Sequence, residues 1–238
     1  EGPMKTCFGS ALVSLLAMVS CAYAQAPASQ AADADHHFEA QDFATATPAD
    51  VTEIQGVFTA IIDALHNRDG KTAGHLVPKS TIDFYEVCRR MALDSAAIDF
   101  EQLSQTEVLL VLQLRYMLSR DELSKMTGKD VFEWGVNEGF VSEKGMKGIS
   151  LNTIQLDGDV AFATLFKDRQ PVPGLAFRFV REANRWTLDM LYITKAVEPA
   201  YADLRKQANK SKIELAIFLM ERTYKKQIPF EILQGPLK

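Results

Sequence analysis

The stretch FRFVREANRWTLDMLYI, residues 177–193, contains two runs of alternating apolar and polar residues around a short polar turn. Alternation with a period of two is typical of β-strands that bury one face. A two-residue loop at Ala183 and Asn184 would place Arg178 directly opposite Asp189. Such a pair stabilises two strands by roughly 0.2–1 kcal/mol. We therefore expect a β-hairpin in which this ion pair is structural, since an aspartate held by arginine has a lowered pKa and is a poor general base.

A second alternating segment, GISLNTIQLDGDVAFATLF, covers residues 148–166. Asp157 and Gly158 within it are a strong signal for a two-residue hairpin turn. Helical patterns come before and after the two strand-rich segments. The order of helices, antiparallel meander and helices predicts an α+β fold.

The helical patterns have clear start and stop signals. Thr47 is a good N-cap for a first helix, which we expect Gly70 to stop. A further helix is expected to start at Ser80. Another begins at Ser104, where Glu107 three residues later completes a capping box. The segment KDVFEWGVNEG, residues 129–139, is a short helix that ends at its final glycine, and helical character returns at about residue 197.

The N-terminus has the pattern of an export signal. Residues 1–3 precede Met4 and look like a cloning remnant, and a short positive start, an apolar run and Ala22-Tyr23-Ala24 follow. This predicts a signal peptide within residues 1–24, cleaved before Gln25, and a periplasmic or secreted protein. The alternatives are a membrane anchor and a lipoprotein attached to the membrane through Cys21.

The remaining chain divides into three parts by composition. Residues 25–46 are rich in Ala, Gln and Asp and predict a flexible linker. We expect an α+β domain over 47–195 and a C-terminal helical extension over 196–238. His36 and His37 are adjacent in the linker and make a weak metal site.

Composition and motifs exclude several classes of function. The formal net charge is −5 and no long basic run appears, so we expect no nucleic-acid partner. The phosphate-binding, dinucleotide-binding, zinc-protease and nucleophile-elbow motifs are all absent, and we expect neither a cofactor nor a metal. Cys88 lies in an amphipathic helical stretch and is interpreted as a buried, unreactive thiol.

The order of elements and the hairpin together resemble the nuclear transport factor 2-like superfamily, which includes ketosteroid isomerase and scytalone dehydratase. Many secreted bacterial members end in a similar hairpin, matched here by Phe177, Phe179, Val180, Arg181, Glu182, Trp186, Leu188 and Asp189. The resemblance covers roughly residues 48–194. It implies a cone-shaped fold in which helices pack on a curved antiparallel sheet.

The resemblance also implies a cavity, but it assigns no catalytic residue. Isomerase-like members use an Asp with a Tyr-containing oxyanion site, and dehydratase-like members use a His-Asp arrangement. Neither set can be carried over residue by residue to this sequence. Tyr85, Tyr116 and Trp186 are candidate cavity liners, and the pair of Arg178 and Asp189 is the best-placed polar group for a cavity or a structural role.

The C-terminal helix carries more apolar residues than one buried stripe requires. Seven of the eight residues from Ile213 to Met220 are apolar, whereas a single stripe needs three or four per two turns. We expect burial on two sides. The second side could be the cone mouth, a second subunit in a homodimer, or residues 197–208.

These observations lead to three hypotheses about function. The first is an exported, non-catalytic domain that binds a small apolar ligand or a protein partner. The second is an isomerase- or dehydratase-like enzyme acting in the cone. The third is an architectural role in the cell envelope through the C-terminal helices.

Overall fold

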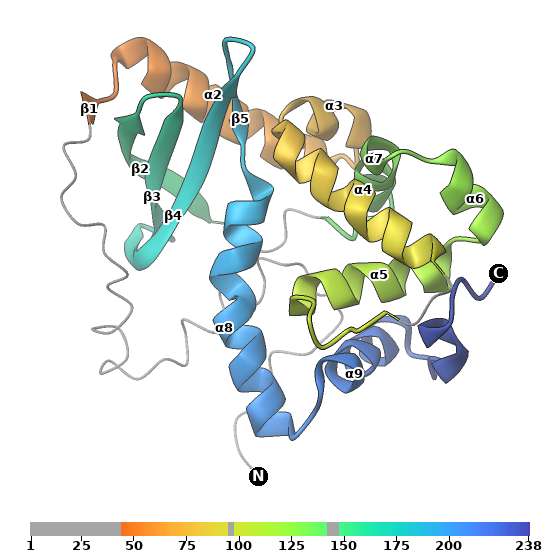
Figure 1. Cartoon of the computed structure of the whole chain (residues 1–238). Helices are drawn as coiled ribbons and strands as arrows, with labels where there is room; N and C mark the ends of the chain where they lie inside the picture. Colours follow the sequence, from red (N-terminus) through yellow and green to blue (C-terminus); the bar gives the residue numbers. More distant parts are fainter. Residues whose placement is uncertain (1–43, 95–97, 142–147) are drawn as a thin grey trace.

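The computed structural model describes residues 44–94, 98–141 and 148–238 (Figure 1). The predicted signal peptide, Cys21 and the His36-His37 pair lie outside these ranges, as does most of the predicted linker. Within the described residues a short strand and a block of helices precede the main strands of an antiparallel sheet, and further helices follow them. The expected α+β fold is therefore confirmed.

The described strands form one five-stranded sheet in which neighbours in the sequence are neighbours in space. Every adjacent pair is antiparallel, and β2 to β5 form a simple meander. Figure 1 shows the sheet curving beside the long helix α2 (Pro48–His66) and ending at the helix α8 (Met190–Ala208). The strands are β1 (Ala44–Thr45), β2 (Ile149–Asp157), β3 (Val160–Lys167), β4 (Gln170–Glu182) and β5 (Arg185–Leu188).

The turn between β4 and β5 has the expected register. Glu182 pairs with Arg185, so Ala183 and Asn184 form the two-residue loop. Both loop residues have positive φ, at 50° and 61°, which is the backbone that a tight hairpin with right-handed twist requires. The earlier hairpin turns one residue later than predicted, because Asp157 itself pairs with the first residue of β3.

The second alternating run ends sooner than its pattern suggests. β5 stops at Leu188, and the helix α8 (Met190–Ala208) starts about seven residues before the expected position. The cause is Asp189, whose Oδ1 accepts hydrogen bonds from the main-chain N–H groups of Leu191 and Tyr192. An aspartate in this position is a strong N-cap and starts a helix.

The helices before the sheet are α2 (Pro48–His66), α3 (Gly70–His75), α4 (Lys79–Leu93), α5 (Gln105–Met117), α6 (Arg120–Lys125) and α7 (Gly128–Asn137). Those after α8 are α9 (Lys212–Tyr224) and the 3₁₀ helix η3 (Phe230–Leu233). The capping box predicted at Ser104 is present, and Ser211 forms another at the start of α9.

Gly70 does not stop the first helix as predicted. That helix ends at His66, and Gly70 instead opens α3. A Cβ at this glycine would lie 2.2 Å from the carbonyl oxygen of Glu133. The glycine is therefore required by the close approach of α3 to α7 rather than by a helix end.

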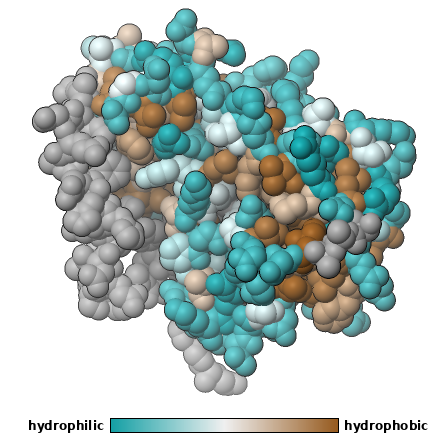
Figure 2. Space-filling model, in the orientation of Figure 1, coloured by the Kyte–Doolittle hydropathy of each residue, from teal (hydrophilic) through white to brown (hydrophobic). Residues whose placement is uncertain are grey.

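One hydrophobic core joins the sheet to the helices. Phe177, Phe179 and Leu188 are buried on the face of the sheet that meets α2, where the rings of Phe58 and Phe177 lie 5.5 Å apart. The same core continues to the buried residues of α9, which packs on α5. In Figure 2 most of the visible surface is hydrophilic, and hydrophobic residues gather around α5.

One side of the C-terminal helix α9 is covered by α5, a surface that the sequence did not suggest. Its burial on a second side stays a prediction. The expected boundary between residues 195 and 196 falls inside α8, which continues across it. The C-terminal segment therefore shares its core with the preceding residues.

Candidate functional site

The polar residues of the β4–β5 hairpin hold the N-termini of three helices. Glu182 accepts a hydrogen bond of 2.9 Å from the main-chain N–H of Lys79, the first residue of α4. Asp189 caps α8, as described above. The first turn of α2 is held through its residue Asp50. Carboxylates are favourable at these positions because the N-terminus of a helix carries unpaired N–H groups and a partial positive charge.

The contact with α2 involves Arg181 and Trp186. Both donate to Oδ1 of Asp50, the first as an ion pair and the second from Nε1 over 3.2 Å. The guanidinium of Arg181 also lies 4.4 Å from the centre of the indole ring. The pKa of Asp50 is lowered, chiefly by its hydrogen bond with the side chain of Thr47 and further by these two donors. Trp186, a predicted cavity liner, is thus a buried residue that holds the first turn of α2 through Asp50.

The outer edge of β5 is also occupied. The main-chain N–H of Trp186 donates to Glu53 over 3.1 Å, and that of Leu188 donates to the carbonyl of Leu76 over 2.8 Å. Unpaired edge groups would otherwise invite pairing with another chain. On this side of the sheet the fold covers them with its own residues.

Arg178 and Asp189 form the ion pair that the register predicts. Nη1 of Arg178 lies 2.6 Å from Oδ2 of Asp189, and the main-chain N–H of Asp189 donates to the carbonyl of Arg178. The side chain of Asp189 is 5% exposed, whereas that of Arg178 is 34% exposed. Both carboxylate oxygens are engaged, one by the guanidinium and the other by the start of α8. Both oxygens of Asp189 are therefore engaged in holding the fold.

Two aromatic residues lie beside this pair. Phe162 is opposite Arg178 on β3, and its ring lies 5.8 Å from that of Tyr192 in the first turn of α8. Partial burial raises the pKa of Tyr192.

The other two predicted cavity liners have different neighbours. Tyr85 packs edge-on against Phe84 and against Phe132 of α7, at ring distances of 5.6 and 5.1 Å, and burial raises its pKa strongly. Tyr116 packs against Tyr224 of α9 at 4.8 Å. Tyr85, Tyr116 and Trp186 therefore have three separate sets of neighbours, and their role as liners of one cavity stays a prediction.

Arg115 is fully buried, and it is the charged group whose role sequence reasoning missed. Its guanidinium makes five hydrogen bonds of 2.6–3.1 Å, all to main-chain carbonyl groups: those of Met91, Ala92, Asp94, Ile232 and Leu233. Burial lowers its pKa. The side chain ties the end of α4 to η3, and no local sequence signal announces partners that distant.

Cys88 is a buried free thiol whose pKa is raised by burial, as its interpretation from the sequence implied. No cluster of three or more metal-ligating side chains occurs among the described residues.

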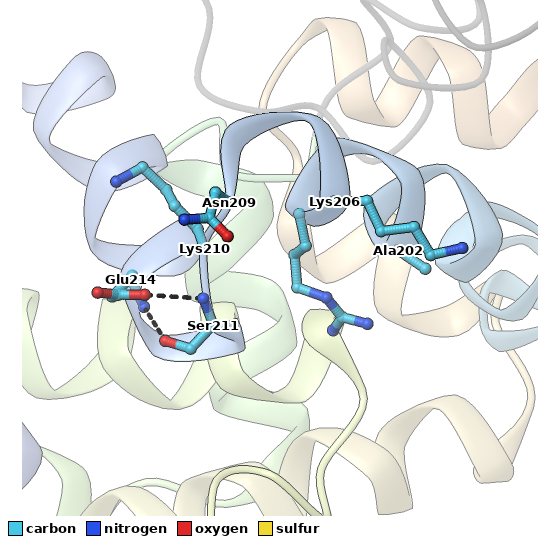
Figure 3. Close-up of a pocket in the computed structure, with 7 residues that line it drawn as sticks. Ala202, Lys206, Asn209, Lys210, Ser211 and Glu214 are labelled. Carbon is cyan, nitrogen blue, oxygen red and sulfur yellow. Dashed lines mark hydrogen bonds between the residues drawn. The ribbon is translucent and has the colours of Figure 1, made fainter.

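A hollow of about 460 Å³ lies where α8 meets α9 (Figure 3). Its lining residues are Ala202, Arg205, Lys206, Asn209, Lys210, Ser211 and Glu214. Ser211 and Glu214 satisfy each other in the capping box. Figure 3 shows the side chains of Lys206 and Lys210 pointing in different directions, so the basic groups do not converge on one point. The hollow therefore lacks the geometry of an anion site.

Comparison of the chain with protein-family models, curated proteins and solved structures finds no match in any of the three. The resemblance to the nuclear transport factor 2-like superfamily therefore stays a prediction. None of the helices in the described ranges is long and apolar enough to cross a membrane.

Proposed function

We propose that this protein is an exported, non-catalytic domain that binds a small apolar ligand or a protein partner. The observation that carries the proposal is the use of its carboxylates. Asp50, Glu182 and Asp189 each accept hydrogen bonds at the start of a helix or from side chains that hold one. The carboxylate of Glu198 does the same for the N–H groups of Gln105 and Thr106 at the start of α5.

Acid–base catalysis needs a group that is free to take up or release a proton within reach of a substrate. Carboxylates that accept hydrogen bonds from the N-termini of helices hold the fold in place, which favours a structural role over proton transfer. Export is supported by the N-terminal sequence pattern. The absence of recognisable cofactor motifs in the sequence favours binding over the commoner classes of catalysis.

Native mass spectrometry of protein purified from the exported fraction tests the binding function. The expected spectrum contains a bound small molecule or polypeptide that is lost on denaturation and returns on re-addition. A parallel assay follows the isomerisation of an unsaturated ketosteroid by absorbance, with Asp189→Asn as the comparison. Turnover that disappears in this variant at an unchanged melting temperature would contradict the non-catalytic proposal.

N-terminal sequencing of the exported protein tests its location. A chain that begins at Gln25 supports a free periplasmic or secreted protein. A lipid-modified Cys21 would instead attach it to a membrane, and an uncleaved N-terminus in the cytoplasmic fraction would contradict export.

A further inference from the structure

The two edges of the sheet differ in how they are covered. The outward N–H groups of β5 donate to Glu53 and Leu76. At the opposite edge, β1 pairs with Gln155 and Leu156 of β2 only, and the chain then leaves to start α2. Within the described ranges, no strand pairs with Ile149–Ile154 on the side away from β3.

The uncovered segment has the composition of a strand that can pair further. Its sequence is ISLNTI, without charge and without proline, although exposed edges are usually protected by such residues. Ile149 and Leu151 are half-buried and pack against the core, so part of their apolar surface remains exposed at the edge. A bulge follows Leu151, where the N–H of Thr153 turns inward to Thr164 Oγ1. The bulge thus ties this part of the strand to β3 through a side chain.

We propose that this edge binds an extended segment of a partner polypeptide, which adds to the sheet as a strand in line with β1. The proposal rests on the proposed binding function and names the partner class for it. Main-chain hydrogen bonds would supply affinity, and side chains at alternate positions would supply selectivity. The part of the partner segment that pairs with the edge is expected to be uncharged, with apolar residues at alternate positions that cover Ile149 and Leu151.

A single strand suits this edge better than a second copy of the protein does. Stable protein–protein interfaces bury about 1,200–2,000 Å² in total, and a pair of six-residue strands buries much less. An extended peptide can instead place every alternate main-chain group on the edge without a larger surface. β1 is already an example of such pairing, since it is a two-residue segment held on the same edge.

The test uses the capped peptide acetyl-KTVTITVTK-amide and a version that is N-methylated at alternate residues. Binding is measured by fluorescence anisotropy, and its location by amide hydrogen exchange. The unmodified peptide should bind saturably and slow exchange within Ile149–Ile154. The methylated peptide, which keeps the side chains but lacks half of the N–H donors, should bind at least tenfold more weakly.

Charge substitutions on the edge provide the matched comparison. Ser150 and Asn152 are exposed, so S150K/N152K should fold normally. At low salt this variant should bind the Lys-ended peptide more weakly and a Glu-ended peptide more tightly than the natural protein does. Gln170→Lys, at an exposed position on β4, should change the affinity for neither peptide.

Several outcomes would overturn the proposal. They are absent binding, protection elsewhere, dimerisation of the protein through these same amides, and peptide binding that appears only after residues 25–43 are deleted. Dimerisation would identify a second copy as the occupant, and the deletion result would identify the chain's own N-terminal segment. None of these outcomes tests the proposed binding function itself, which the native mass spectrum decides separately.

Discussion

One carboxylate oxygen of Asp189 accepts a hydrogen bond from Arg178, and the other accepts hydrogen bonds from the first turn of α8. The same residue therefore closes the last strand of the sheet and starts the helix that leads to the C-terminal elements. An ion pair across two strands contributes little when it is exposed, but here the acidic partner is almost fully buried. The helix cap adds a second contribution that the arginine does not share.

Substitutions at Asp189 should separate these two contributions. Asp189→Ala removes both the cap and the ion pair, and we expect it to lower the free energy of unfolding by about 2–3 kcal/mol. Asp189→Asn keeps a capping oxygen and should cost about 1 kcal/mol. Urea denaturation followed by circular dichroism measures both values.

Arg178→Met provides the second side of a double-mutant cycle. It should cost roughly 1 kcal/mol, and combined with Asp189→Asn it should cost less than the sum of the two single changes. Equal losses for the Ala and Asn variants would show that the cap contributes nothing. Strict additivity would show that the two residues do not interact.

The buried guanidinium of Arg115 should be one of the most sensitive positions in the protein. Arg115→Met leaves carbonyl groups of α4 and η3 without their donor, and we expect a loss of about 3–5 kcal/mol or failure to fold. Arg90→Met is the matched control on an exposed arginine and should cost less than about 1 kcal/mol. Calorimetric melting of both variants gives the comparison, and similar melting temperatures would contradict this account.

The sequence was most informative where the decisive signals are local. The loop at Ala183 and Asn184 set the hairpin register, and with it the pairing of Arg178 with Asp189. The capping box at Ser104 depends only on residues three positions apart. In each case the physical cause lies within one turn of chain, so one sequence is enough to predict it.

Predictions failed, or could not be made, where contacts between residues far apart in the sequence determine the structure. In TLDMLYI the strand-like alternation continues past Leu188, where β5 ends. It hides the start of α8, because an aspartate such as Asp189 is compatible both with a strand and with a helix N-cap. Gly70 was read as a helix stop, but its requirement comes from Glu133, more than sixty residues away. Arg115 has partners on both sides of it, up to 118 residues distant. No periodicity in a single sequence predicts contacts of this kind.

The free energy of unfolding should fall as the pH drops below about 4.5, in part because Glu86 becomes protonated. Hydrogen bonds from Arg89 and Arg90 lower the pKa of its carboxyl from 4.5 to about 2, against the opposing effect of burial. Because the folded-state pKa is depressed, the stabilisation is fully present above the unfolded value and is lost as the pH falls from about 4.5 to 2. Glu86→Gln should therefore be less stable than the natural protein at pH 6, by roughly 1 kcal/mol after allowance for solvent screening.

Denaturation series at pH 6, 4 and 2.5 measure this difference directly. The difference between the two proteins should narrow steadily and be smallest at pH 2.5, because other carboxyl groups titrate equally in both. Asp121→Asn on the exposed surface of α6 serves as a control and should change stability little at any pH. A gap between Glu86→Gln and the natural protein that stays constant with pH would contradict the role given to this carboxyl.

Removal of residues 196–238 should prevent the rest of the chain from folding cooperatively. The truncation cuts α8 in the middle, removes the Glu198 carboxylate from the start of α5, and uncovers the apolar surface of α5 on which α9 packs. Exposure of several buried core residues costs about 1.5–3 kcal/mol for each, which exceeds the total stability of most domains. We expect a remnant that aggregates or melts without a cooperative transition in calorimetry. Glu198→Gln in the full chain is the matched mild variant, and it should fold with a loss of about 1–2 kcal/mol. A monomeric truncated protein with a sharp transition would show that residues 47–195 form an independent domain, as their sequence alone suggested.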